Sequence, residues 1–303
     1  MKNTIILSLI FLSVMLSMPL LIMDKSPRIV SKVNSTESND NRYIDVILNN
    51  SQSQQIERRE FIIGTLAAEM DINYSDEALK AQAVACSAYA EYLAVHSENS
   101  VEHQNYADIN ERKKSWDDSF EKNEEKLEKI VDSIEKVKLT CNGETIKALS
   151  FDCSSGVTQN SETVFGTEFP YLKSVQSSGD KLSPNYSDSK IISEDEFKTK
   201  FKDIKFDKNP NNWVNNVEKN NSGYVKSITV MNKKISGKEF AKTLGLKSAV
   251  FYISYEDNKF KIITYGNGHQ VGMSRAGAEY MAKQGADYKE ILEHYYPGVQ
   301  ISD

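Results

Sequence analysis

Two helical patterns follow one another in IERREFIIGTLAAEMDINYSDEALKAQAVACSAYAEYLAVH, residues 56–96. In the first of them, residues 56–70, the spacing places Ile62, Leu66 and Glu69 on one face of a helix. Two of these side chains are apolar, so this face should point towards a hydrophobic core. The stretch therefore predicts an inward-facing helix that ends on a carboxylic acid.

The second helix is predicted over residues 76–96. Ser75 before it is typical of a helix N-cap, and the acidic residues after it suit the positive end of the helix dipole. The helix is rich in alanine, so other segments can approach closely and we expect it to be central. It contains Cys86, a small buried hydrophobe by this pattern. Together with Cys141 and Cys153 it makes an odd number of cysteines, too few for a disulfide framework in this chain.

The composition is that of a globular protein. The chain has 303 residues, enough for one large domain or two ordinary ones. Hydrophobic residues make up 39% and charged residues 26%, and the net charge is −6. This balance excludes a polybasic nucleic-acid-binding protein as the default class.

Residues 4–23 are apolar and uncharged, and they are about as long as a membrane-spanning helix, roughly 20 residues. A cleaved signal peptide would have a shorter apolar region followed by a cleavage site with small residues. Here the apolar stretch is followed directly by Asp24. We therefore predict an uncleaved anchor, with the signal peptide as the alternative. The flanking lysines and arginine do not decide the orientation. Residues 1–24 would form a cytoplasmic stub and anchor, and residues 25–53 a polar tether.

The order of the elements in the rest of the chain predicts an α+β fold, a mixed helical and antiparallel β body with an inserted smaller α/β subdomain. The core would comprise residues 54–175 and 261–303, and the insertion residues 176–260. Asn142-Gly143 is a strong hairpin signal. We expect residues 97–118 to be turn-like. The other predicted helices are 119–134, 238–244, 275–284 and 288–295, and the predicted strands are 43–48, 136–140, 145–151, 224–230, 250–253 and 260–265.

Glu69 has the clearest chemical implication. Apolar surroundings and the negative end of a helix dipole both disfavour a carboxylate, so both would raise the pKa of Glu69. A carboxylic acid kept protonated near neutral pH is suited to protonating a glycosidic oxygen. The alternative is a glutamate turned to solvent at a frayed helix end.

Two loops carry further polar groups. GNGHQVGMS, residues 266–274, is typical of a tight turn and fits neither a P-loop nor a dinucleotide fingerprint. SSGVTQN, residues 154–160, offers hydroxyl and amide groups, which bind sugars and also occur in ordinary turns. No Gly-x-Ser-x-Gly elbow surrounds Ser154, which disfavours a serine hydrolase. A cysteine hydrolase using Cys153 and His269 stays open as an alternative.

Three stretches together resemble one known family. They are IIGTLAAEMDINYSDEALKAQAVACSAYA (62–90), ALSFDCSSGVTQNSETVFGTEFPYLKSV (148–175) and GHQVGMSRAGAEYMAKQGADYKEILEHYYPG (268–298). They resemble the stage II sporulation protein D family, lytic transglycosylases of peptidoglycan that act in spore engulfment. The similarity covers most of residues 55–298, and the apolar N-terminal segment matches the family's membrane anchor.

The resemblance implies a set of site residues. The family's catalytic glutamate ends an Ala-Ala-Glu-Met stretch and falls on Glu69. The family's Ser-x-Gly-x-Thr-x-Asn loop and glycine-histidine motif would line a glycan groove. The substrate-binding residues implied in this way are Ser154, Ser155, Thr158, Asn160, Tyr171, His269, Gln270, Met273 and Ser274.

The chain also departs from the family pattern. Gln270 stands where the family has glycine and Asp71 where it has proline, which puts the activity in doubt. Some relatives carry a zinc site with one histidine and two cysteines, and this chain keeps His103 but has Ile109 and Ser115 at the other two positions. Because zinc needs several thiolate or imidazole ligands, we predict no metal and no other cofactor.

The implied mechanism uses one carboxyl group twice. Glu69 protonates the oxygen between N-acetylmuramic acid and N-acetylglucosamine, then accepts a proton as the muramyl 6-hydroxyl attacks, which gives a 1,6-anhydro end. Implied partners are glycan strands and other engulfment proteins, an amidase and membrane subunits among them, and no nucleic acid. The implied location is the cell membrane, single-pass, with the body on the extracytoplasmic side, in the intermembrane space of the sporulating cell. The alternatives are an inactive glycan-binding or scaffolding subunit and an amidase acting on stem peptides.

Overall fold

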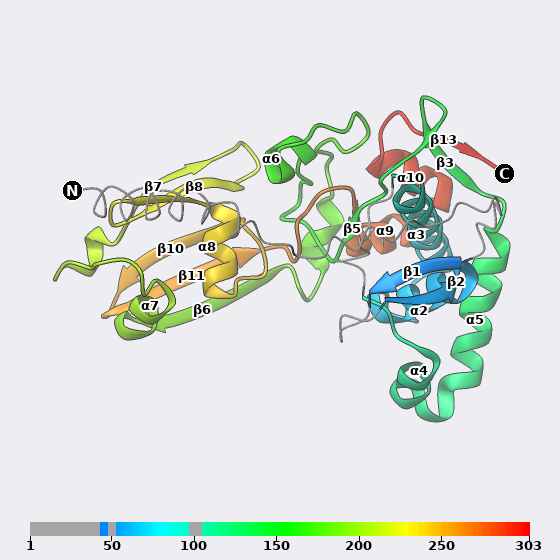
Figure 1. The fold of residues 1–303 in the computed structure, drawn as a ribbon, viewed down its shortest axis with the longest axis horizontal. Helices are drawn as coiled ribbons and strands as arrows, with labels where there is room; N and C mark the ends of the chain where they lie inside the picture. The colour runs from blue at the N-terminus through cyan, green and yellow to red at the C-terminus, as the bar shows by residue number, and fades with distance from the viewer. Residues whose placement is uncertain (1–42, 48–52, 97–104) are drawn as a thin grey trace, which may run out of the picture. The chain divides into compact units, whose positions relative to one another are not determined.

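The computed structural model describes residues 43–47, 53–96 and 105–303 (Figure 1). The predicted anchor and most of the predicted tether lie outside this part of the chain. Within the described ranges, no helix combines the length and apolar character that crossing a membrane requires. The first elements are two antiparallel strands, β1 (Tyr43–Ile47) and β2 (Ser53–Glu57), of which the sequence predicts only β1.

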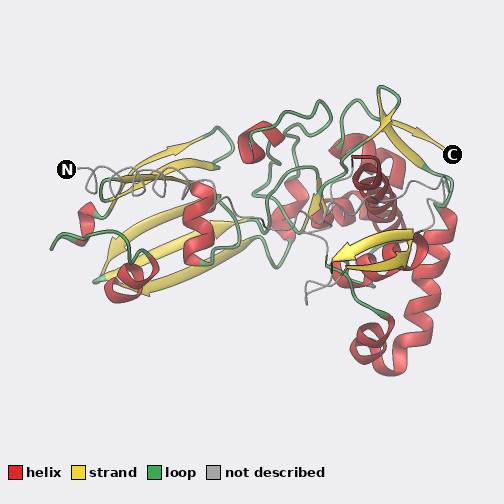
Figure 2. Ribbon diagram, in the orientation of Figure 1, coloured by secondary structure: helices red, strands yellow, loops and turns green. Residues whose placement is uncertain are grey.

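A helical core surrounds α3 (Asp76–His96). This helix contacts α2 (Arg58–Glu69), α5 (Phe120–Ser133), α9 (Arg275–Lys283) and α10 (Tyr288–Tyr295) (Figure 2). Its alanines other than the one at position 94 are at most 3% exposed. Their small side chains let four helices approach one axis, and this confirms the predicted central position of the alanine-rich helix.

The predicted hairpin forms. The Asn142-Gly143 turn joins β3 (Lys138–Cys141) to β4 (Glu144–Thr145), and its two residues have φ of 53° and 84°. Positive φ at both positions is what a type I′ turn requires. β13 (Gln300–Ser302) pairs with the other edge of β3.

The predicted strand at residues 145–151 is wrong in extent. After β4 the chain leaves the hairpin, because Lys147 N–H donates to the Tyr171 hydroxyl at 2.9 Å instead of to a neighbouring strand. The chain resumes as β5 (Ser150–Phe151), which pairs in parallel with β12 (Met273–Ser274). This short pairing brings together two segments that are far apart in the sequence.

A second hydrophobic cluster lies among residues 192–262. Two antiparallel sheets enclose it, in the strand orders β10-β11-β6 and β7-β8-β9. Phe197 stacks on Phe260 with ring centroids 4.3 Å apart, and Trp213 is 1% exposed. The α+β class is therefore confirmed, while the predicted domain boundaries stay predictions. The elements are β6 (Ser187–Ser193), α7 (Glu194–Lys200), η3 (Pro210–Asn212), β7 (Val214–Lys219), β8 (Val225–Val230), β9 (Lys233–Ser236), α8 (Gly237–Leu244), β10 (Phe251–Glu256) and β11 (Lys259–Tyr265).

The prediction that residues 97–118 are turn-like is wrong for their second half. That half contains α4 (Ile109–Trp116), followed by η1 (Asp117–Ser119). Asp108 caps α4 in a capping box, which satisfies two backbone N–H groups at the start of the helix. Arg112 anchors α4 to the core, because its guanidinium is 1% exposed and pairs with carboxylates on α2 and α5.

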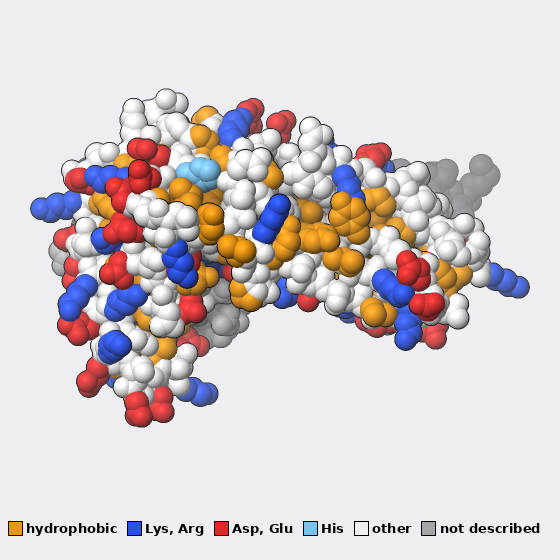
Figure 3. Space-filling model, turned by 180° about the vertical axis from the view of Figure 1, so that it is seen from behind, with side chains coloured by type: hydrophobic (Ala, Val, Ile, Leu, Met, Phe, Trp, Pro, Cys, Tyr) orange, Lys and Arg blue, Asp and Glu red, His pale blue; other side chains and the backbone are white. Residues whose placement is uncertain are grey.

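Acidic and basic side chains are interspersed over both ends of the face drawn in Figure 3. Hydrophobic side chains gather along the middle of the face drawn there. Large hydrophobic side chains with exposed surface include Leu182, Ile191, Tyr252 and Ile263. The mixed charge agrees with the globular class that the composition predicts.

Candidate active site around Glu69

Glu69 is the last residue of α2, and its side chain is only 5% exposed. Ile62 and Leu66 on the same face are 3% and 0% exposed. The prediction that this carboxyl faces inward is confirmed, and the solvent-exposed alternative is wrong.

Three segments meet at the carboxyl. Arg275 Nη1, from the first turn of α9, lies 3.1 Å from Glu69 Oε2. Gln82 Nε2, from α3, donates to the same oxygen at 3.2 Å, and Asn105 N–H donates to Oε1 at 3.3 Å. Gln82 Nε2 also donates to the Ser150 hydroxyl on β5 at 2.9 Å. The carboxyl is therefore held by donors from two helices and a loop, and the contact of Gln82 with Ser150 ties this group to β5.

The electrostatic surroundings of Glu69 act in opposite directions. Burial raises the pKa of the carboxyl above its ordinary value, while the positive charge of Arg275 and the N–H of Asn105 lower it. Burial is the larger effect, so the net shift of the pKa is upward. The carboxyl therefore stays protonated to a higher pH than an ordinary glutamate does, and its ionised form has a cation beside it.

A glycine makes one of these contacts possible. Gly64 lies in the middle of α2, where a Cβ atom would stand 2.3 Å from the ring of Tyr106. Ala107 N–H donates to the Gly64 carbonyl at 3.1 Å, so the segment that carries Asn105 lies directly against the helix. A larger residue at position 64 would push this segment away, which explains a residue otherwise unfavourable inside a helix.

Arg275 is positioned by the turn before it. Gly272 has φ of 82°, and a Cβ there would lie 2.1 Å from the Leu149 carbonyl oxygen. Ser274 then caps α9, because its hydroxyl accepts from Gly277 N–H at 3.1 Å. The glycine-rich motif of residues 266–274 thus serves to start α9 with Arg275 facing Glu69.

Asp180 ties this turn to the hydroxyl-rich loop. Its side chain is fully buried in η2 (Ser178–Leu182). Ser154 N–H donates to one carboxylate oxygen at 2.6 Å and the Ser274 hydroxyl to the other at 2.6 Å. Burial raises the pKa of Asp180, while these bonds lower it. We infer that Asp180 fixes the relative position of the two loops.

Most of the residues predicted to bind substrate are buried and bonded within the protein. Ser154 Oγ accepts from Gly156 N–H at 3.0 Å, and Thr158 Oγ1 accepts from Val175 N–H at 2.8 Å. Hydroxyls used in this way stabilise the loops that surround Glu69. Direct contacts of these side chains with a substrate stay a prediction. The predicted residues that are below 9% exposed are Ser154, Thr158, Tyr171, Gln270, Met273 and Ser274.

Gln270 shows why glycine would fit its position. Its φ is 62°, in the left-handed region that disfavours side chains. Its amide spans two loops, donating to the Tyr265 carbonyl at 2.9 Å and accepting from Ser155 N–H at 3.0 Å. These two bonds offset the conformational cost, so the departure from the family pattern has a structural role.

Asn160 and His269 lie at the surface of the loops. Asn160 is exposed, and its side-chain oxygen accepts from Ser174 N–H at 2.7 Å. His269 Nδ1 accepts from Val271 N–H at 3.1 Å, and its ring lies edge-on to Phe151 and Phe165. The neutral imidazole therefore carries its proton on Nε2.

The cysteine hydrolase alternative finds no support in the geometry. Cys153 is fully buried, and burial raises the pKa of its thiol to about 11. A nucleophilic cysteine needs a lowered pKa, because the thiolate is the reactive form. The possible metal ligand His103 lies outside the described residues, and the described ones contain no group of three His, Cys, Asp or Glu placed to hold a metal ion.

Sequence reasoning missed Gln82 and Arg275, the two side chains that hold Glu69. A signal for Gln82 was present, because it is the one amide among the small residues of α3 and is fully buried. A fully buried amide in an apolar helix must find a partner. No comparable signal marks Arg275, whose position depends on the β5–β12 pairing.

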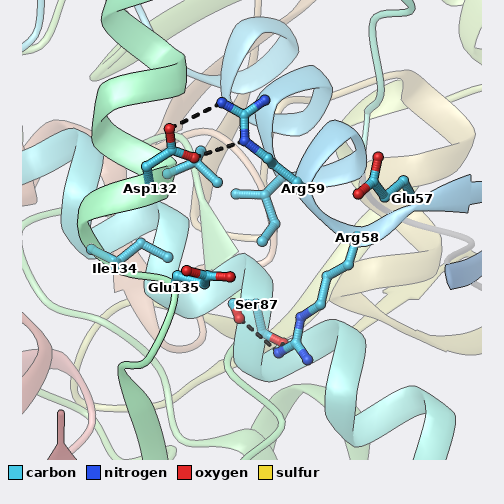
Figure 4. A pocket seen from close by; sticks show the side chains of 9 residues that line it. Glu57, Arg58, Arg59, Ser87, Asp132, Ile134 and Glu135 are labelled. Carbon is cyan, nitrogen blue, oxygen red and sulfur yellow. Dashed lines mark hydrogen bonds and ion pairs between the residues drawn. The ribbon is translucent and has the colours of Figure 1, made fainter. Parts of the chain in front are cut away.

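A separate cavity of about 490 Å³ lies at the other end of α2 (Figure 4). Arg58 donates to the Ser87 hydroxyl at 2.7 Å on one side, and Arg59 pairs with Asp132 at 2.7 Å on the other. Both cations are therefore engaged within the protein. This cavity is not part of the site around Glu69.

Comparisons with known proteins place the chain among sporulation proteins. A family model described as stage II sporulation protein matches residues 49–140, which include Glu69. The chain is 36% identical over 270 residues to stage II sporulation protein D of Bacillus subtilis (strain 168), covering 84% of this chain and 77% of that one. It is 34% identical over 266 residues to stage II sporulation protein D of Bacillus amyloliquefaciens, with coverage of 84% and 76%. It is also 24% identical over 298 residues to an amidase enhancer of Bacillus subtilis, with coverage of 79% and 40%.

Proposed function

The chain belongs to the stage II sporulation protein D family, and we propose that it acts in sporulation as a lytic transglycosylase of peptidoglycan. Glu69 is the catalytic acid and then the catalytic base. The observation that carries the proposal is the buried carboxyl of Glu69, 5% exposed and paired with Arg275 at 3.1 Å.

In the first step, protonated Glu69 gives its proton to the oxygen that joins N-acetylmuramic acid to N-acetylglucosamine. The bond between that oxygen and the muramyl C1 breaks, and positive charge develops on the muramyl ring. The raised pKa of Glu69 supports this step, because it keeps the carboxyl protonated to higher pH.

In the second step, the Glu69 carboxylate accepts the proton of the muramyl 6-hydroxyl as that oxygen bonds to C1. The product has a 1,6-anhydro end, no water is consumed and the acid is regenerated. Arg275 and Gln82 stabilise the carboxylate between the two steps. Arg275 Nε is buried without a hydrogen-bond partner among the described residues.

The test is digestion of purified glycan strands, intact and stripped of stem peptides, followed by mass spectrometry. We expect Glu69→Gln to lower the rate by about 10²–10⁴-fold, as loss of a general acid–base group does. Glu57→Gln, an exposed glutamate next to the other end of α2, is the matched control and should keep full activity. Anhydro products should be about 20 mass units lighter than reduced hydrolysis products, roughly 18 for water and roughly 2 for the added hydrogens.

Each other outcome has a distinct meaning. Reducing ends would make the protein a hydrolase. An unchanged rate in Glu69→Gln would move the catalytic group elsewhere. No cleavage of either substrate by the unmutated protein would favour an inactive glycan-binding or scaffolding subunit.

The location and partners are part of the same proposal. Residues 4–23 would anchor the body on the extracytoplasmic side of the cell membrane, where peptidoglycan lies. Similarity to a protein named for enhancing an amidase supports a cell-wall amidase as one partner in engulfment. Fractionation of sporulating cells tests the location, because removal of residues 4–23 should release the protein from the membrane fraction.

A further inference from the structure

A second polar cavity, of about 510 Å³, lies beside the hydroxyl-rich loop. One wall is this loop and the start of α6 (Ser161–Phe165), and the other is the turn between β7 and β8. That turn belongs to the asparagine- and lysine-rich stretch, which the proposed cleavage reaction does not use. The lining residues with amide or hydroxyl side chains are Gln159, Asn160, Thr163, Ser174, Gln176, Asn220, Asn221 and Ser222.

The inner layer of this cavity is fixed by bonds between its two walls. Gln159 is fully buried, and its side-chain oxygen accepts from Asn220 Nδ2 and from the Ser222 hydroxyl, both at 2.8 Å. The orientation of the Gln159 amide is therefore set. Its Nε2 is buried and has no hydrogen-bond partner in the described part of the chain. A buried donor without an acceptor is costly, so a ligand oxygen at this point would be favourable.

The outer layer is free to bind. The side chains of Thr163, Gln176 and Asn221 make no hydrogen bonds with other described residues, and Gln176 and Asn221 are exposed. Their amides and hydroxyl both donate and accept hydrogen bonds. The cavity thus combines a fixed inner row of such groups with an adaptable rim.

The charge of the lining narrows the class of ligand. Among the described residues no carboxylate lines the cavity, and the lysines that line it are Lys219 and Lys226. Lys219 is engaged, because its Nζ donates to the Phe251 carbonyl at 2.9 Å and lies over the Tyr252 ring. The ligand should therefore be neutral or weakly anionic, with hydroxyl and amide groups of its own. A phosphate would instead call for guanidinium groups or several free lysines.

We propose that this cavity binds an N-acetylated sugar unit of a glycan, away from the point of cleavage. Hydroxyl and acetamido groups match the donors and acceptors of the wall, and polar groups placed in a concave site give orientation and specificity. The binding site stands on the cavity itself. Only its use in holding the substrate strand rests on the proposed transglycosylase function.

A short stretch of backbone connects this cavity to the proposed catalytic acid. Gln159 N–H donates to the Gln270 carbonyl, and Gln159 pairs in parallel with Val271. The chain then runs through β12 to Arg275, which contacts Glu69. A glycan held at the cavity is thus bound to the same rigid frame that positions the acid.

The test measures binding of hexa-N-acetylchitohexaose by calorimetry to the full chain carrying Glu69→Gln, which prevents cleavage. Replacing Gln176 and Asn221 together by alanine should weaken binding by about fivefold or more, as expected for two lost hydrogen bonds. The matched control replaces Asn232 and Gln284, an exposed asparagine and glutamine outside the cavity, and should leave Kd within about twofold.

The side chains exchanged in the cavity variant and in its control make no hydrogen bond with other described residues, so circular dichroism should show the folding of the Glu69→Gln parent for both. A Kd of the cavity variant within about twofold of the parent overturns the proposal, as does equal binding of cellohexaose, which lacks the acetamido groups. Failure of the catalytic proposal is seen separately, in the digestion of glycan by the protein with Glu69 intact.

Discussion

Exchanging Arg275 for methionine removes the cation beside Glu69 and keeps a side chain of similar length. The two groups are 3.1 Å apart and their side chains are 13% and 5% exposed. Unit charges at this distance attract by about 5 kcal/mol with an effective dielectric constant of about 20. Removing one partner of such a buried pair typically costs about 3–5 kcal/mol, because the other charge is left uncompensated. We expect a loss of that size in the free energy of unfolding wherever Glu69 is ionised.

This loss should depend on pH, with a definite sign. Burial raises the pKa of Glu69 above its ordinary value of 4.5, and Arg275 counteracts the rise. Without Arg275 the pKa rises further, so the folded variant holds a proton that the unfolded chain has already released. The stability of the variant is therefore undiminished below about pH 4.5, the ordinary pKa of the carboxyl. It is lost as the pH rises through the raised pKa of the folded state. The difference from the parent should be largest at alkaline pH.

Urea unfolding followed by circular dichroism, repeated across this pH range, measures the effect. Arg59→Met is the control, because its ion pair with Asp132 is at the surface and should contribute at most about 1 kcal/mol. A double-mutant cycle with Glu69→Gln isolates the interaction of the pair. A coupling energy below about 0.5 kcal/mol, or a deficit that does not change with pH, would refute the proposed balance between burial and charge.

Three further predictions address the anchor, the metal and the loop frame. Deleting residues 1–24 should leave a soluble, folded and active protein by gel filtration and glycan digestion, and aggregation would mean that the segment belongs to the fold. Chelators should change neither melting temperature nor activity, since Ile109 and Ser115 occupy two of the family's zinc-ligand positions, and stoichiometric zinc by elemental analysis would contradict this. Asp180→Ala should lower the free energy of unfolding, measured in urea, by about 1–3 kcal/mol for each buried donor left unpaired. A smaller total change would show that the two loops hold each other in place without Asp180.

Local patterns predicted the helices well, because their causes are local. The stripe of Ile62, Leu66 and Glu69 set the direction of α2, and the alanines of α3 predicted its central place. The helix α4 was missed, since its sequence is polar between its first and last residues and its anchor is a buried arginine with partners on two other helices. Nothing in the spacing of neighbouring residues signals a contact of that kind.

The site also has one part that a local pattern predicts and another that depends on contacts between distant segments. The inward position of Glu69 followed from periodicity on a single helix. The approach of Arg275 depends on β12 pairing with β5, a contact between segments more than a hundred residues apart. The roles of the loop hydroxyls were also hidden, since a serine that caps a helix and one that binds a sugar look alike in sequence. Only the hydrogen bonds of Ser154 and Ser274 distinguish the two uses.

A reaction that uses one carboxyl group twice makes opposite demands on that group. It must be neutral when it gives its proton to the glycosidic oxygen and charged when it accepts a proton from the 6-hydroxyl. Burial in the core favours the first state and Arg275 favours the second, so neither contact alone would serve both steps. Burial alone would disfavour the ionised form that the second step needs, and the cation alone would disfavour the protonated form that the first step needs. The pairing of the two influences at Glu69 is therefore the feature that links this fold to the proposed chemistry.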